Sequence, residues 1–126
     1  MNNLDRIRAR YLQDPLPRRL GGIAADLARV VSSSRHADAS EVVALMLEES
    51  QHFIEWAVAE ADLAVAAELV DVQIGLALWR KIWPEAQHHA GHRALLAWQA
   101  KQWSDRLLQI SGLLDSAPAL PTLTIP

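Results

Sequence analysis

Residues 41–83 determine the fold, and they read EVVALMLEESQHFIEWAVAEADLAVAAELVDVQIGLALWRKIW. One apolar stripe runs through the whole stretch, because its members recur every three or four residues, which is the period of an α-helix. The stripe comprises Val43, Leu47, Ser50, Ile54, Val58, Ala61, Val65, Leu69, Val72, Leu76, Trp79 and Trp83. We therefore expect this stretch to be helical and to supply most of the core.

The sequence leaves open whether residues 41–83 form one helix or two. The continuous apolar stripe favours one helix. The charged face, however, moves around the axis beyond Val58, and a straight helix of about forty residues is unusual in a small domain. We favour two helices that meet near residues 57–61.

The later part of the stretch also bears a second apolar stripe, which includes Leu63, Val70 and Ile74. Several alanines and Gly75 give this helix a thin surface, which lets neighbouring helices approach closely. Because apolar residues occupy more than one side, we expect the helix to be buried on more than one side and to be the central helix of the bundle.

The remaining elements follow from prolines and periodicity. A short amphipathic helix ends before Pro15, so residues 1–15 form an N-terminal arm. A second helix begins near Pro17, a residue that suits the first helical turn. Pro84 is expected to stop the long helical stretch, and a last helix is expected over about residues 92–114.

These elements predict an all-α fold, a four-helix bundle or a close variant, in a single domain over residues 1–126. The short N-terminal helix is additional to the bundle. Residues 116–126 contain three prolines and cannot be helical, yet Leu120, Leu123 and Ile125 make them more apolar than an ordinary linker. We expect them to form an extended strap over the bundle or over a partner.

Composition narrows the function classes. The chain has no cysteine, which excludes disulfides, thiolate metal sites and thiol catalysis. Residues 1–14 lack the apolar core of a secretory signal peptide, and no uncharged apolar run approaches the ~18 residues that a membrane span needs. We therefore expect a soluble, cytoplasmic protein without a membrane span. The acidic isoelectric point near 5.9 argues against a nucleic-acid partner.

Charge is distributed unevenly along the chain. The first 35 residues contain seven Arg and three Asp, whereas residues 36–79 contain nine acidic residues and no Lys or Arg. Basic helices packed beside acidic ones within the bundle are the favoured interpretation. A basic face for an anionic partner is the alternative.

Two Glu-x-x-His motifs suggest a metal site, namely Glu49 with His52 and Glu85 with His88, and His92 lies one helical turn beyond His88. A di-metal site would need further carboxylates at the same level. The first bundle helix has no Glu, and Glu85 directly follows a proline in an expected connection. We expect no metal or other cofactor, and we retain these five residues as the basis of an alternative function, a metal-binding or metal-dependent bundle.

Aromatic and arginine content gives the leading functional hypothesis. Five Trp in 126 residues is a high content, and Trp, Tyr and Arg are enriched at binding hot spots. No catalytic set is recognisable, so an enzymatic activity is not favoured. We expect a non-enzymatic interaction or structural protein that self-associates, most simply as a homodimer, or docks to another protein. The interface candidates are Trp79, Trp83, Trp98, Tyr11, Arg18 and Arg19.

A third hypothesis concerns an apolar ligand. Gly75 would leave space between the helices, and a small apolar molecule or cofactor beside it would require an enclosed apolar pocket.

Overall fold

The computed structural model describes residues 2–114, and in this part of the chain every regular element is a helix and there is no strand. The helices are α1 (Asn3–Tyr11), α2 (Leu16–Ser33), α3 (Ser40–Val58), α4 (Leu63–Ala86) and α5 (Ala90–Ile110), with a short 3₁₀ turn, η1 (Ala37–Ala39), before α3.

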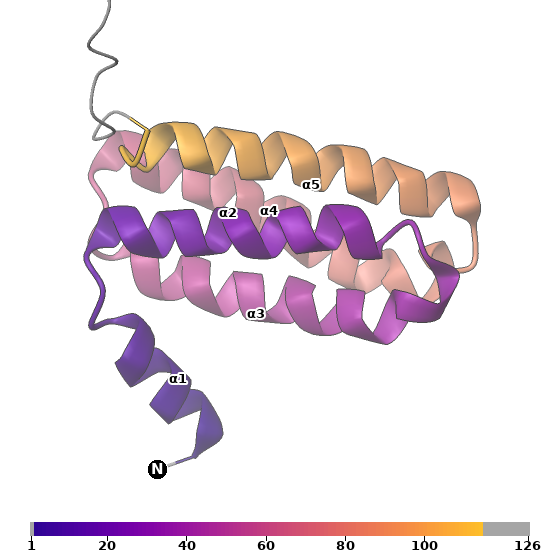
Figure 1. The fold of residues 1–126 in the computed structure, drawn as a ribbon, viewed down its shortest axis with the longest axis horizontal. Coiled ribbons are helices and arrows are strands. Elements are labelled where there is room, and N and C mark those ends of the chain that lie inside the picture. The colour runs from indigo at the N-terminus through magenta and orange to yellow at the C-terminus, as the bar shows by residue number, and fades with distance from the viewer. Residues whose placement is uncertain (1, 115–126) are drawn as a thin grey trace, which may run out of the picture.

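Helices α2 to α5 form a four-helix bundle in which consecutive helices run in opposite directions (Figure 1). Helix α2 packs on both α3 and α5, most extensively on α5, and α3 also packs on α4. Helix α1 lies at an angle outside this bundle and contacts α3. The expected all-α fold with an additional N-terminal helix is therefore confirmed.

The long apolar stretch forms two helices, as favoured from its shifting polar face. Helix α3 ends at Val58, and α4 begins after Asp62, whose carboxylate accepts a hydrogen bond from the Val65 backbone N–H at 2.9 Å. This side-chain cap explains why the chain breaks here without Gly or Pro. The first apolar stripe is buried on both sides of the break, at Val43, Leu47, Ser50, Ile54, Leu69, Val72, Leu76, Trp79 and Trp83.

Two expected helix ends were wrong. Pro84 lies inside α4, which continues to Ala86. Pro84 has no N–H to donate to the Arg80 carbonyl, so one helical hydrogen bond is missing here. The helical turn nevertheless continues past it, because the Gln87 N–H donates to the Trp83 carbonyl at 2.9 Å. Helix α5 begins at Ala90 and ends at Ile110, so Leu114 lies beyond the helix and is exposed.

The expected position of α4 at the centre of the bundle was also wrong. The second stripe is exposed, with relative accessibilities of 87% at Leu63, 47% at Val70 and 65% at Ile74. Helices α3 and α5 flank α4, and the first stripe fills its inward side. A helix in a four-helix bundle keeps one side towards solvent, and the second stripe occupies that side.

Two further expectations concern the C-terminal strap and a membrane span. The strap expected over residues 116–126 lies outside them. Within residues 2–114, no helix is both long and apolar enough to cross a lipid bilayer.

Gly75 marks a close approach between α4 and α5, as its small size suggested. The Trp103 indole of α5 occupies the space that a Cβ atom at position 75 would need. The apolar space beside Gly75 is therefore filled by the chain itself, which removes the basis for an apolar ligand at this position. Gly21 is similar, because the Leu113 side chain lies where its Cβ atom would be.

We expect Gly75→Ala to destabilise the protein by about 1–3 kcal/mol, because the rigid indole must move and overpacking outweighs the helix propensity gained. Gly22 in α2 is the matched control, since no atom lies within 4 Å of its virtual Cβ. Gly22→Ala should stabilise the protein by about 0.5–1 kcal/mol. Urea unfolding followed by circular dichroism measures both changes, and a stabilising Gly75→Ala would contradict the packing described.

Candidate interaction surfaces

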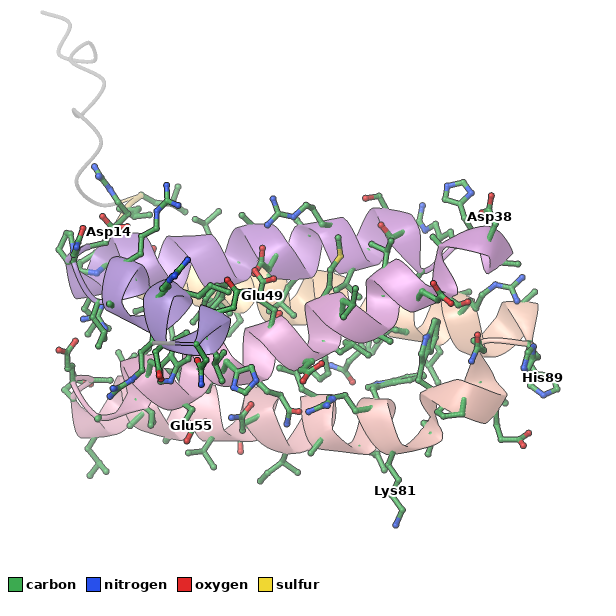
Figure 2. All side chains as sticks on the ribbon, turned by 90° about the horizontal axis from the view of Figure 1, so that it is seen from below. Asp14, Asp38, Glu49, Glu55, Lys81 and His89 are labelled. Carbon is green, nitrogen blue, oxygen red and sulfur yellow. The ribbon has the colours of Figure 1, made fainter. Side chains whose placement is uncertain are left out.

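The predicted metal ligands lie in two separate places. Glu49 and His52 are on α3, and Glu49 projects beside α1 in Figure 2. Glu85 and His88 lie at the end of α4 and in the turn after it, and His92 is in the first turn of α5. His89, labelled in Figure 2 at that end of the bundle, has its ring 5.0 Å from the ring of His92. Across residues 2–114, no three His, Asp or Glu side chains are grouped so as to hold a metal ion.

The tryptophan candidates divide into buried and exposed residues. Trp79 and Trp83 are buried in the core, and the Trp83 indole N–H donates to the Ser40 carbonyl at 3.0 Å. They therefore offer no surface to a partner in the folded bundle. Trp98 on α5 is 59% exposed and remains available. The stripe that defines the core already included Trp79 and Trp83, so periodicity was a better guide to their position than residue type.

Among the arginine candidates, Arg18 is exposed and Arg19 is buried. Arg19 forms an ion pair with Glu60 and donates from Nε to the Asp14 carbonyl at 3.0 Å. Its guanidinium also lies over the Tyr11 ring, 5.6 Å from the centroid. These contacts connect α2 to the segment between α3 and α4 and to α1, so Arg19 has a structural role.

Tyr11 belongs to an aromatic cluster that attaches α1 to α3. Its ring stacks on Phe53 with centroids 4.5 Å apart and lies 5.8 Å from Trp56. The Tyr11 hydroxyl donates to the Arg19 carbonyl at 3.2 Å. Burial raises the pKa of the Tyr11 phenol well above its ordinary value, because the phenolate would lose hydration.

A groove of about 470 Å³ extends from this cluster between α1 and α3. Leu4 and Ile7 of α1 line one side, and Leu45, Glu49 and Trp56 are among the α3 residues on the other. A smaller hollow of about 290 Å³ lies between α3 and α4. Both are open, and each contains carboxylates of the acidic segment at its rim.

The seam between α4 and α5 is joined by an ion pair between Glu68 and Arg106. The hydrogen bond from Arg106 lowers the pKa of the Glu68 carboxyl below its usual range, because the bond favours the charged form. This pair and the contact of Trp103 with Gly75 join α4 to α5, and together with the buried stripe they hold α4 in one rotation about its axis.

That rotation produces the largest aligned set of exposed apolar side chains on one helix. We define the outer face of α4 as the exposed positions that follow one another at helical spacing: Leu63, Ala67, Val70, Ile74, Ala77, Leu78 and Lys81. Lys81 points away from the bundle in Figure 2 and is the one charged member. Leu78 is 57% exposed, and Ile82 adds a partly exposed side chain near the edge of the face.

Sequence reasoning did not identify this outer face as a binding surface. The signal was present, because Leu63, Val70 and Ile74 were recognised as a second stripe. It was interpreted as a second buried side, since sequence does not show how many neighbours a helix has. Comparisons with protein-family models, curated proteins and solved structures find no match to this chain.

We expect Tyr11 to ionise well above pH 10, because burial favours the neutral phenol. A raised folded-state pKa means that the phenol stabilises the fold below about pH 10, its unfolded-state pKa. That contribution is lost as pH rises through the folded-state pKa. Absorbance at 295 nm reports the titration directly, since Tyr11 is the one tyrosine of the chain.

Phe53→Ala removes the ring that stacks on Tyr11 and should therefore bring the pKa of the Tyr11 phenol closer to about 10. Circular dichroism should confirm that the helices persist in this variant. A native protein that titrates near pH 10 while still folded would show that α1 is not attached to α3 in this way.

Proposed function

We propose that this protein is a non-enzymatic helical interaction protein that self-associates through the outer face of α4. The observation that supports the proposal is the exposure of Leu63, Ile74, Leu78 and Val70, which ranges from 47% to 87% along one face of one helix. Isolated exposed apolar residues are normal on protein surfaces. An aligned series on one helix is typical of a face that packs against another helix.

The opposite side of α4 carries apolar residues at the same helical spacing, and there they are packed against the rest of the bundle. Leu69, Val72 and Leu76 have the same spacing and are buried within the bundle. Fully burying such a side chain contributes about 1.5–3 kcal/mol. An apolar face complements another apolar face, so two copies of the chain that met through α4 would gain a part of this contribution at each position, in proportion to the surface that becomes buried.

A pair of matched valines tests the proposal. Val70 on the outer face is 47% exposed, and Val42 on α3 is 45% exposed. We expect Val70→Glu to raise the dissociation constant of the self-associated form by about 30-fold, because a carboxylate buried without a partner at the centre of the contact costs about 2 kcal/mol. Val42→Glu adds the same charge at the same exposure elsewhere and should leave the dissociation constant unchanged.

Analytical ultracentrifugation over a concentration series measures both constants, and thermal melts establish that both variants fold. A native protein that is monomeric at every concentration would contradict the proposal. So would equal effects of the two substitutions, because association would then not depend on α4.

A further inference from the structure

We infer that the two copies pair through α4 in antiparallel orientation, about a two-fold axis that passes between Val70 and Ile74. In this register Val70 faces the partner's Ile74, Ala67 faces the partner's Ala77, and Leu63 faces the partner's Lys81. The inference rests on the proposed function and specifies its partner as a second copy of this chain.

The spacing of the outer face supports a helix pair. Positions 67, 74 and 81 are seven residues apart, as are positions 63, 70 and 77, and the two sets alternate by three and four. This is the heptad pattern of residues that interlock between two packed helices. All six positions are exposed in the bundle, so they are available to a second helix.

The order of side chains along the face supports the two-fold axis. In a two-fold interface each residue i contacts residue j of the partner and residue j contacts the partner's residue i, so the side chains that face each other must fit in size and character. From the centre outward, a β-branched residue (Val70 or Ile74) is followed by alanine at position 67 or 77 and then by a long side chain at position 63 or 81. Facing alanines let the two helix axes approach to about 8 Å.

Charge favours the antiparallel orientation over the parallel one. A parallel pair would place Lys81 against the partner's Lys81 within the interface. In the antiparallel pair, the aliphatic stem of Lys81 covers the partner's Leu63, which at 87% is the most exposed large apolar side chain within residues 2–114. The ammonium then lies near the partner's Asp62, so the positive charge at one end of α4 meets the negative charge at the other end of the partner's α4.

One charge opposes the pairing. Asp71 is exposed beside the central residues, and the antiparallel register brings it close to the partner's Asp71 across the two-fold axis. A single pair of helices also buries less surface than the about 1,600 Å² of a standard interface. We therefore expect a weak, reversible dimer with a dissociation constant of the order of micromolar.

Introduced cysteines test the register, because the native chain has none to interfere. The variants are Ala67→Cys and Ala77→Cys, both at exposed positions. In the antiparallel pair, residue 67 lies opposite residue 77 of the other copy. Two copies of residue 67 are about 15 Å apart along the axis, which is too far for a disulfide.

Mild oxidation of a mixture of the two variants should therefore give disulfide-linked dimers, whereas either variant alone should give few. The reverse pattern, with each variant linking to itself, would establish a parallel pair and overturn the inference. If neither pattern occurs while Val70→Glu still weakens association, the proposed function stands and this register is wrong.

If the chain is monomeric, thiol labelling of the Ala67→Cys variant shows whether the outer face of α4 is covered by the chain itself or is left open to a different protein. A protected thiol at position 67 would show that the chain's own residues cover the outer face, and a freely reactive thiol would leave the face to a different protein. Either result overturns pairing with a second copy, and the monomeric state itself overturns the proposed function.

A charge variant provides an independent test. Asp71→Asn should lower the dimer dissociation constant by about two-fold, with a larger effect at low salt, because it removes a like-charge pair. Glu41→Gln, at an exposed position on α3, makes the same change in net charge and should have no effect. Equal effects of the two variants would show that Asp71 does not meet its copy, which contradicts the register.

Discussion

Burial of the apolar stripe shared by α3 and α4 is the interaction on which the bundle depends. Leu47, Ile54, Leu69 and Leu76 have at most 1% of their surface exposed, and each contributes about 1.5–3 kcal/mol through burial. The chain has no disulfide to assist them. This burial sets the rotation of both helices about their axes, and rotation in turn determines which side chains face outward.

The outer face of α4 is a consequence of that rotation. Leu69 and Leu76 point into the bundle, so Val70 and Ile74, which lie on the far side of the same helix, point out of it. The contact of Trp103 with Gly75 reinforces this arrangement from α5, because a flat indole packs against a helix side that lacks a Cβ atom. No rotation of α4 within a four-helix bundle would bury both stripes.

Electrostatics has a smaller role and connects the ends of the chain to its acidic middle. Arg19 pairs with Glu60, and Arg106 pairs with Glu68, so bases from both sides of residues 36–79 reach acids within that segment. This agrees with the expectation that basic and acidic helices complement each other. In each pair one partner, Glu60 or Arg106, is about half exposed, and water screens its charge. These pairs therefore orient helices that apolar burial holds together.

Helical periodicity predicted the fold from the sequence better than residue type predicted the candidate surface. Local periodicity determined the helices and the core positions of α3 and α4, because the same residues recur on one side at every turn. Residue type alone did not indicate that Trp79, Trp83 and Arg19 are buried, since Trp and Arg occur at interfaces and in interiors alike. Asp62 could have located the break between α3 and α4, because a capping carboxylate needs only local contacts.

The sequence by itself determined that α4 is a helix with two apolar sides. Only the tertiary structure decided which side is buried, because both stripes have helical spacing and comparable hydrophobicity. The choice depends on contacts between residues far apart in the chain, such as Trp103 with Gly75 and Arg106 with Glu68. A four-helix arrangement gives each helix one inward side, so the second stripe of α4 remains on the surface.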